Sequence, residues 1–230
     1  MFWQEDRPER EVAIPDDIID VQFALSGKRI PVDHAHALAA AIAGSLPPEV
    51  AAAELGVHSV HVAGSQNGWE RPAHDGHHHL MLSRRTKLTI RAPKQQAAAL
   101  KQALTGQTLS VGGCQLNIGA AKERLLSGET TLFARHVVDP FQANDEERFL
   151  EWAVGELRAL DIAVRKALCG KTTRLATPDG ALLTRSLLLA ELSVSDSLAL
   201  QRRGIGTGRQ MGCGIFIAHK GIDAVQPEGR

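Results

Sequence analysis

The chain of 230 residues, 43% of them hydrophobic, is long enough to form one large domain or two small ones with a substantial core. No apolar run reaches the roughly 18 residues that a membrane span requires. The acidic N-terminal segment lacks the apolar stretch of a secretory signal peptide, and Cys114, Cys169 and Cys213 are too widely spaced for a zinc knuckle. We therefore expect a cytoplasmic protein with free thiols.

The formal net charge of zero conceals an uneven distribution of 26 basic and 26 acidic residues. Residues 1–20 contain seven acidic and two basic residues, and residues 139–161 contain the same numbers. The remainder has 22 basic and 12 acidic residues, which permits a face that binds a polyanion. The acidic segments should then lie away from that face. The segment at 139–161 is interpreted as a solvated outer face, with a contact for a basic partner as the alternative.

The first half of the chain alternates between strand and helix patterns after an acidic lead-in at 1–19. Apolar and polar residues alternate in 20–26, which is strand periodicity. Asp33 is predicted to cap a helix over 34–45, whose apolar stripe includes Ala35, Leu38 and Ile42. The other predicted elements are strands at 56–63, 80–92 and 107–118, the last with a hairpin turn at Gly112-Gly113, and a helix at 94–104.

The second half repeats this order after a linker predicted at 119–129. Its predicted strands lie at 130–138, 163–168, 181–192 and 211–217, and its helices at 145–160 and 193–203, the second capped by Ser193 or Ser195. Two tandem ferredoxin-like units, each with the order βαββαβ, explain both the length and the order. We predict an α+β fold with domains at 20–118 and 130–222 and a tail at 223–230.

The most distinctive local pattern is a glycine-rich segment at 202–214, between the last predicted helix and the last predicted strand. Glycine permits positive φ and close backbone approach, and exposed N–H groups in such a loop can bind an anion. The alternative is a flexible turn followed by a strand packed tightly under a helix. Spacing excludes a dinucleotide-binding fingerprint, and Gly170-Lys171-Thr172 lacks the earlier glycine of a P-loop.

The ten histidines are the second feature, because imidazole exchanges protons near neutral pH. His34 opens the first predicted helix, where the helix dipole favours a neutral ring that can act as a base. Packing over Leu38 is the alternative for His34, and His36 is the secondary candidate. His58 and His61 are interpreted as structural residues on opposite faces of a strand.

Adjacent histidines at 77–79 point in alternating directions along a strand, so they are poorly placed to share a metal ion. No HExxH or CxxC motif accompanies them. We therefore predict no metal site, with a solvated loop end as the interpretation of this cluster.

Basic residues are the third feature. Arg85, Lys87 and Arg91 share one parity, and hence one face of a predicted strand, which could follow a phosphate backbone or form an ordinary solvated sheet face. The aromatic content of 4%, without tyrosine, argues against a protein that holds bases mainly by stacking. Further candidates for phosphate contacts are Arg84, Arg174, Arg185, Arg202, Arg203 and Arg209, together with the loop glycines Gly204, Gly206 and Gly208.

These features together resemble the CRISPR-associated repeat-RNA endoribonucleases, the Cas-six family of the RAMP superfamily, and more narrowly the subtype defined in Myxococcus-type CRISPR loci. The most specific segment is Arg-Gln-Met-Gly-Cys-Gly-Ile-Phe-Ile-Ala-His-Lys at 209–220, followed by Pro-Val-Asp-His-Ala-His-Ala-Leu at 31–38. Shorter matching segments lie at 21–27, 132–135, 169–171 and 184–187.

The resemblance implies cleavage of CRISPR precursor RNA within the repeat, without a metal or another cofactor. The 2′-hydroxyl of the substrate attacks the adjacent phosphate, which leaves a 2′,3′-cyclic phosphate or 3′-phosphate and a 5′-hydroxyl. The resemblance places the catalytic histidine at His34. A His–Tyr–Lys set, as some members use, is impossible without tyrosine, so Lys28, Arg29 or Arg85 are candidates for charge stabilisation.

The resemblance also implies the partners, which are the repeat RNA and subunits of a CRISPR effector complex. The glycine-rich loop, with Arg203 and Arg209, is expected to contact RNA or to brace the loop that does. Two other functions stay open. A non-catalytic RNA-binding subunit on the same fold would bind repeats without forming product, and a metal-dependent hydrolase using His74 and the histidines at 77–79 would be inhibited by a chelator.

Overall fold

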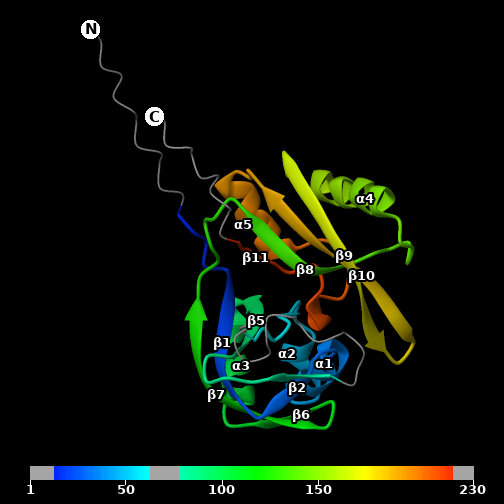
Figure 1. Cartoon of the computed structure of the whole chain (residues 1–230). Coiled ribbons are helices and arrows are strands. Elements are labelled where there is room, and N and C mark those ends of the chain that lie inside the picture. Colours follow the sequence, from blue (N-terminus) through cyan, green and yellow to red (C-terminus); the bar gives the residue numbers. More distant parts are fainter. Residues whose placement is uncertain (1–12, 63–77, 220–230) are drawn as a thin grey trace, which may run out of the picture.

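The computed structural model describes residues 13–62 and 78–219, which form two lobes, each built on an antiparallel sheet (Figure 1). The N-terminal lobe holds the elements from β1 to β7, and the C-terminal lobe holds those from β8 to β11. Within the described residues, no helix combines the length and the apolar character needed to cross a bilayer.

The N-terminal sheet has the strand order β3-β5-β1-β7-β6, which is ferredoxin-like apart from the added edge strand β6. Its strands are β1 (Ile18–Ser26), β3 (Gly56–Val57), β5 (Lys87–Pro93), β6 (Thr108–Val111) and β7 (Cys114–Arg124). A separate pair joins β2 (Arg29–Pro31) to β4 (His79–Met81). The helices are α1 (Ala35–Ala43), α2 (Pro48–Ala51) and α3 (Ala97–Leu104), the last preceded by the 3-10 turn η2 (Lys94–Gln96).

One face of this sheet and the two longer helices enclose the first core. Every second residue of β1, including Val21 and Phe23, is fully buried. The helices contribute Leu38 from α1 and Leu100 and Leu104 from α3. Full burial of each such side chain stabilises the fold by about 1.5–3 kcal/mol. The predicted alternation of β1 and the predicted stripe of α1 are therefore confirmed.

The C-terminal sheet has the order β11-β8-β10-β9, again that of a ferredoxin-like unit. Its strands are β8 (Leu132–Val138), β9 (Lys166–Thr177), β10 (Gly180–Ala190) and β11 (Phe216–Ala218). Its helices are α4 (Glu146–Ala159) and α5 (Val194–Arg203), and the turn η3 (Arg209–Met211) precedes β11. The two tandem ferredoxin-like units expected from the sequence are thus present.

Several predicted elements differ in extent from the structure, among them the strand expected over 56–63, of which only Gly56–Val57 forms β3. The strand expected over 80–92 is two strands, because β4 pairs with β2 whereas β5 pairs with β1. The hairpin at Gly112-Gly113 is confirmed, but β7 continues to Arg124, so the connection to β8 is shorter than 119–129. Hairpin pairing with β10 also extends β9 to Thr177, and β11 has only three residues.

Helix caps follow the predictions in the C-terminal lobe but not at α1. Ser193 Oγ accepts the Asp196 N–H at 3.0 Å and caps α5. At α1 the N-cap residue is His34, which makes no side-chain capping bond. Asp33 instead accepts the Ala176 N–H at 2.7 Å, so this carboxylate ties the start of α1 to β9 of the other lobe.

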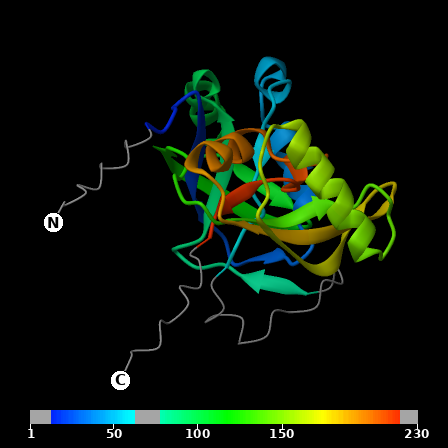
Figure 2. The ribbon, with the colours of Figure 1, turned by 90° about the horizontal axis from the view of Figure 1, so that it is seen from above.

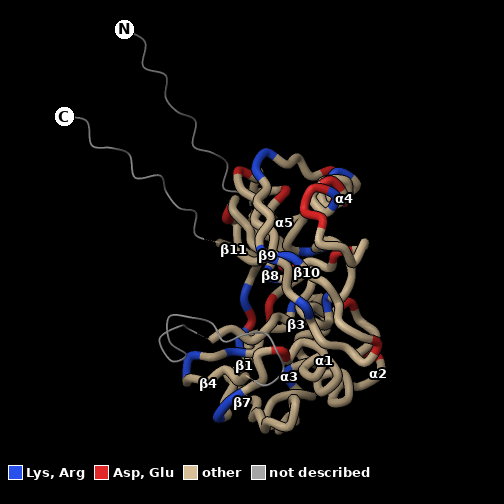
Figure 3. The backbone as a smooth tube through the Cα atoms, turned by 45° about the vertical axis from the view of Figure 1, so that its right-hand side comes forward, with Lys and Arg blue, Asp and Glu red and all other residues tan. Residues whose placement is uncertain are grey.

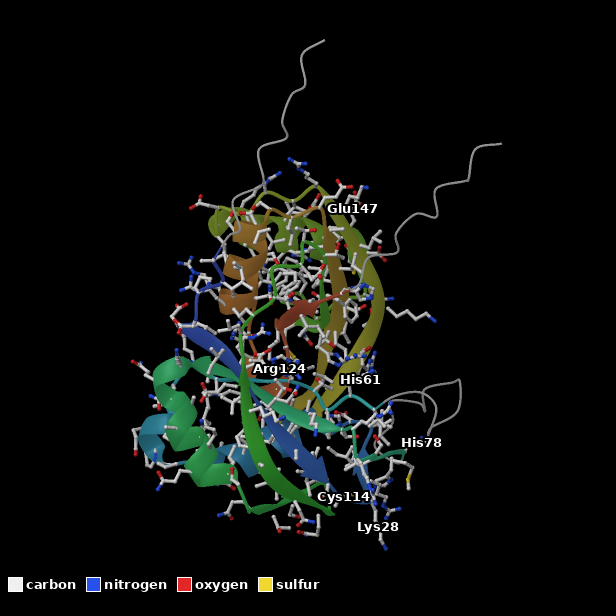
Figure 4. All side chains as sticks on the ribbon, turned by 90° about the vertical axis from the view of Figure 1, so that its left-hand side faces the viewer. Lys28, His61, His78, Cys114, Arg124 and Glu147 are labelled. Carbon is white, nitrogen blue, oxygen red and sulfur yellow. The ribbon has the colours of Figure 1, made fainter. Side chains whose placement is uncertain are left out.

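The acidic helix α4 lies on the outer side of the C-terminal sheet (Figure 2). It packs through Phe149, Ala153 and Leu157, while Glu146, Glu147 and Glu151 are exposed. Figure 3 shows the acidic positions of this helix in red along the backbone. Glu147 lies at the end of the molecule opposite Lys28 (Figure 4). The helix of the second acidic segment therefore faces outward, as the charge pattern predicted. Asp20 of the first acidic segment contradicts that prediction, because it lies between the lobes beside Arg91.

Candidate nucleic-acid interface

The face of the N-terminal sheet that is turned away from the core is polar, and the strand register arranges it in rows. Asp20 on β1 lies opposite Arg91 on β5, and Gln22 lies opposite Thr89. The next row on the same face contains Lys87. The C-terminal lobe covers the first row, whereas Gln22, Thr89 and Lys87 line a cleft between the lobes.

Arg91 is the residue through which the two lobes meet at the covered row. Its Nε and Nη2 donate to the two carboxylate oxygens of Asp20 at 2.8 and 3.0 Å. Its Nη1 donates to the carbonyls of Gln201 at 2.8 Å and Phe216 at 2.7 Å. Only 2% of Arg91 is exposed, which corrects the expectation that it contacts a phosphate. Arg91 and Lys87 do lie on the same face of β5, as predicted. The C-terminal lobe covers this face at Arg91 but leaves it open at Lys87.

Arg185 on β10 is likewise an interior residue. Its Nη2 donates to Asn144 Oδ1 at 3.0 Å, and its guanidinium lies 5.9 Å from the ring centroid of Phe149. Its Nε is 4.0 Å from the buried carboxylate of Asp139. Arg185 is 4% exposed, so the expectation of a phosphate contact is corrected here too.

The cleft between the lobes has a volume of about 260 Å³ and is strongly basic. Arg85 and Lys87 contribute charge from the N-terminal lobe, Arg135 contributes charge from β8, and His58 and His61 add two imidazoles. Among the described residues, none that lines the cleft carries a carboxylate. The other lining residues are Gln22, Ser59, Thr89, Phe133, Gly212, Ile215 and Ile217.

The C-terminal wall of the cleft is formed by the outward residues of β8. Leu132 and Ala134 are buried, whereas the alternate residues Phe133 and Arg135 are partly exposed. The Arg135 guanidinium lies 5.9 Å from the Phe133 ring centroid, and its Nη2 donates across the cleft to His61 Nδ1 at 3.3 Å. Arg135 was not among the sequence-predicted residues, although the alternation of β8 could have found it.

His58 and His61 both line the cleft, which corrects their interpretation as residues on opposite faces of a strand. The strand β3 ends at Val57, so the alternation of side chains does not extend through 58–61. Figure 4 shows His61 at the level where the lobes meet. In the sequence, only the short spacing of three residues between His58 and His61 indicated that they could lie together.

His58 and Asp20 form a pair on the floor of the cleft. His58 Nε2 lies 3.5 Å from Asp20 Oδ1, and both side chains are largely buried. Burial lowers the pKa of His58, and the nearby Asp20 restores it only in part. Burial also tends to raise the pKa of Asp20, but contacts with His58 and Arg91 outweigh burial and hold that pKa well below its ordinary range.

The glycine-rich segment is tightly folded. A side chain at Gly204 or Gly214, both at positive φ, would meet a backbone oxygen at 2.1 Å, and one at Gly212 would meet Ser59 Oγ at 2.7 Å. The N–H groups of Cys213 and Gly214 donate to the carbonyls of Gly208 and His136. These internal bonds support the close-packing interpretation of the segment over that of an anion-binding loop.

Arg209 braces this segment. Its guanidinium donates to the carbonyls of Arg202, at 3.2 Å, and Arg203, which end α5. Arg202 itself pairs with Asp17, whereas Arg203 and Gly206 are exposed. Arg209 was expected either to contact RNA or to brace the glycine-rich loop, and the structure shows it bracing the loop.

A second pocket, of about 610 Å³, lies on the other side of the glycine-rich segment. The half-buried His36 of α1 lines it together with Thr207, Gly208 and Met211. The turn between β9 and β10 supplies Asp179 and its neighbours, and no lysine or arginine is among the lining residues.

His34 lies between these two pockets and is 3% exposed. Its Nδ1 donates to the Pro31 carbonyl at 2.8 Å, and its Nε2 accepts the Val60 N–H at 3.0 Å. This pattern corresponds to a neutral ring with its proton on Nδ1. Ser59 and His61, on either side of Val60, line the cleft, so His34 lies directly behind the cleft wall.

The remaining predicted residues are dispersed. Lys28 and Arg29 are exposed at the turn after β1, and Figure 4 shows Lys28 at the end of the N-terminal lobe remote from His61. Arg84 is exposed beside Arg85, and Arg174 is exposed on β9. His74 and His77 lie outside the described residues.

Comparisons with known proteins agree with this architecture. The family model described as Cas6 Crispr matches residues 19–221. The chain is 29% identical over 212 residues to the CRISPR-associated endonuclease Cas6 of Myxococcus xanthus (strain DK1622), covering 92% of this chain and 86% of that protein.

Two solved structures show the same fold. One, described as CRISPR associated protein Cas6, has a TM-score of 0.61 at 11% identity and covers 88% of this chain and 100% of its own. The other, from a Cas6-related gene of Pyrococcus furiosus, has a TM-score of 0.60 at 15% identity, with 86% and 97% covered. With a family match over nearly the whole described chain, this protein belongs to the Cas6 family of CRISPR-associated proteins.

Proposed function

We propose that this protein is an endoribonuclease that cleaves CRISPR precursor RNA within the repeat, by attack of a 2′-hydroxyl on the adjacent phosphate. The observation that carries the proposal is the basic cleft between the lobes, in a chain of the Cas6 family. The part of the chain that the structure describes contributes no carboxylate to its lining. The chemistry needs no metal, and the enzyme works in the cytoplasm, where precursor transcripts are made. The similarity to the Myxococcus xanthus endonuclease supports an enzyme over a binding subunit.

Arg85, Lys87 and Arg135 are proposed to bind the phosphates of the RNA in the cleft. Cations on both walls can neutralise consecutive phosphates, which supplies affinity without reading the sequence. Phe133 and the exposed His219, whose rings lie 5.9 Å apart, offer faces against which an unpaired base can stack.

His34 is proposed as the catalytic imidazole, on the resemblance of the segment 31–38 to the family. A base near the 2′-oxygen, or an acid near the leaving 5′-oxygen, contributes about 10²–10⁴-fold to the rate. Because Nε2 of His34 accepts the Val60 N–H, this bond must open before His34 can exchange a proton with RNA. The half-buried His36, two residues along α1, is the matched control.

One assay tests the function and the assignment together. Repeat RNA is incubated with wild type, His34→Ala and His36→Ala, with and without a chelator, and RNA binding is measured in parallel. We expect chelator-resistant cleavage by the wild type, binding without cleavage by His34→Ala, and cleavage by His36→Ala.

The other outcomes are equally informative. Loss of cleavage in His36→Ala alone would move the catalytic role to the second pocket. Binding of repeats without any product from the wild type would identify a non-catalytic RNA-binding subunit of an effector complex. Activity that disappears with chelator would favour a metal-dependent hydrolase.

A further inference from the structure

His58 is held at the floor of the cleft by both lobes. Its backbone N–H donates to the Thr89 carbonyl at 3.0 Å, which fixes it to β5. On the other side, Gly212 packs so closely that an added Cβ would lie 3.1 Å from the Ser59 nitrogen and from the Val57 oxygen. The position of His58 is therefore set before any ligand enters the cleft.

Behind His58, the carboxylate of Asp20 is equally fixed. Both of its oxygens accept hydrogen bonds from Arg91, which is anchored in turn to two carbonyls of the C-terminal lobe. His58 Nε2 is buried and lacks a hydrogen-bond partner among the described residues, yet it lies only 3.5 Å from Asp20 Oδ1. A proton on both ring nitrogens would turn this approach into a charge-assisted contact.

In front of His58, the cleft is crowded with positive charge. Arg85, Lys87, Arg135 and His61 line the cleft. Arg91 of β5 and Arg209 of η3 are not among the lining residues, but their charges also act on the ring. Asp20 of β1 is the one carboxylate beside the ring in the part of the chain that the structure describes. Burial, together with the charges of Arg91 and Arg209, lowers the pKa of His58 more than Asp20 raises it, so the neutral ring predominates in the free protein near pH 7.

We propose that His58, supported from behind by Asp20, is a phosphate ligand of the cleft that binds RNA in its protonated form. A phosphate in the cleft compensates the positive charge of the surrounding cations. It also gives the protonated ring of His58 a second anionic partner, in addition to Asp20. Binding of RNA therefore takes up a proton at His58. This inference rests on the proposed function, because it assigns a residue to the same RNA site.

The sign of the pH dependence follows from this exchange. The protonated ring is favoured in the complex and disfavoured in the free protein, so RNA affinity rises as the pH falls. The gain begins at the pKa of His58 in the complex and levels off below its pKa in the free protein, which lies under the ordinary value of 6.5.

Nuclear magnetic resonance of the histidine rings tests the proposal directly. The His58 signal is assigned by its absence in His58→Gln, and is titrated between pH 5 and pH 8.5 with and without RNA. The RNA is the repeat methylated at its 2′-oxygens, which prevents cleavage by 2′-hydroxyl attack. We expect the pKa of His58 to rise by about one unit or more in the complex, a tenfold change in proton affinity. An unchanged pKa with RNA bound would overturn the proposal.

Calorimetry supplies a second measurement with a matched control. Heats of RNA binding in two buffers of different ionisation enthalpy give the number of protons taken up. At a pH midway between the pKa values of His58 in the free protein and in the complex, as found by the titration, we expect proton uptake by the wild type. His58→Gln should take up clearly less, and His61→Gln should retain the His58 contribution. Equal uptake by the wild type and His58→Gln would contradict the proposal, and thermal unfolding of each variant checks that it is folded.

An inorganic anion separates this inference from the proposed function. Failure of repeat RNA to bind would count against the proposed function. In that case sulfate at low ionic strength, a dianion throughout the titrated range, still tests the residue. A sulfate-dependent rise in the pKa of His58 would support the phosphate-binding role, and no change would overturn it.

Discussion

Lys87 and Arg91 lie on the same face of β5, four residues apart, and occupy opposite environments. Lys87 is exposed in the cleft, whereas Arg91 is 2% exposed and makes four hydrogen bonds, two to Asp20 of its own lobe and two to carbonyls of the C-terminal lobe. The strand fixes their shared face, but the second lobe covers only one end of it. Strand periodicity therefore predicts the direction of a side chain and not what lies against it.

The same contrast separates two groups of cations in the whole molecule. Arg91 and Arg185 are buried beside Asp20 and Asp139, because a guanidinium removed from water requires partners. Arg85, Lys87 and Arg135 line the open cleft. The first group should determine stability and the second RNA affinity, and the following experiments test that division.

The largest expected effect is the loss of stability in Arg91→Met. Removing the guanidinium leaves the Asp20 carboxylate buried without its main partner and the Gln201 and Phe216 carbonyls without a donor. Breaking a buried pair in this way costs about 3–5 kcal/mol. The free energy of unfolding in urea measures it, with Lys87→Met as a control that should change stability by less than about 0.5 kcal/mol. Similar stabilities of the two variants would abolish the contrast.

The next largest effect is on RNA affinity in the triple variant Arg85→Gln, Lys87→Gln, Arg135→Gln. Each phosphate contact to a single strand contributes about −0.7 to the slope of log K against log salt, or about fivefold in affinity at 0.1 M salt. Loss of three contacts should weaken binding about a hundredfold and reduce the slope by about 2. Filter binding across a salt series checks both values, and an unchanged slope would remove the cleft from the RNA path.

A smaller effect is expected in the acid stability of Asp20→Asn. The pKa of Asp20 is depressed in the folded state, so its contribution to stability is present above the ordinary aspartate pKa and is lost as the pH falls toward the folded value. Unfolding measured between pH 5 and pH 2 should show a shallower loss of stability in Asp20→Asn than in the wild type. The exposed Asp179→Asn serves as the comparison and should retain the wild-type slope.

The smallest effect is expected for exposed cations outside the cleft. Lys28 lies at the remote end of the N-terminal lobe (Figure 4). In Lys28→Gln the cleavage rate should therefore stay within about twofold of wild type, and the free energy of unfolding within about 0.5 kcal/mol. A large loss of cleavage in Lys28→Gln would restore its candidacy for charge stabilisation and show that RNA reaches well beyond the cleft.

Much of the fold could be read from local patterns. The apolar residues of β1 and α1 and the glycines of the β6–β7 turn each mark an element without knowledge of the rest of the chain. Errors arose where an element depends on a partner element, whether near in the chain or in the other lobe. The residues at 169–177 continue β9 because β10 pairs with them, and Asp33 leaves α1 uncapped because Ala176 of the other lobe offers it an N–H.

The candidate site was predictable only in part. The sequence identified Arg85 and Lys87 by parity, and the tight glycine-rich segment by composition, but it also selected Arg91 and Arg185 and omitted Arg135. Arg91 and Arg185 are covered by another element, whereas Arg135 lies in the open cleft. The spacing of residues within a strand does not show which of them will be covered. His58 and His61 were misplaced because the strand that would set their directions ends at Val57.

The amino-acid sequence by itself determined the two ferredoxin-like units, the family, and the separation of acidic segments from a basic remainder, because periodicity and charge are local properties. Only the tertiary structure decided which cations remain exposed to a ligand and which are buried in hydrogen bonds within the protein. That decision depends on how the C-terminal lobe covers the polar face of the first sheet. Burying Arg91 is tolerable there because Asp20 and two backbone carbonyls meet its guanidinium, and these groups come together only in the folded chain.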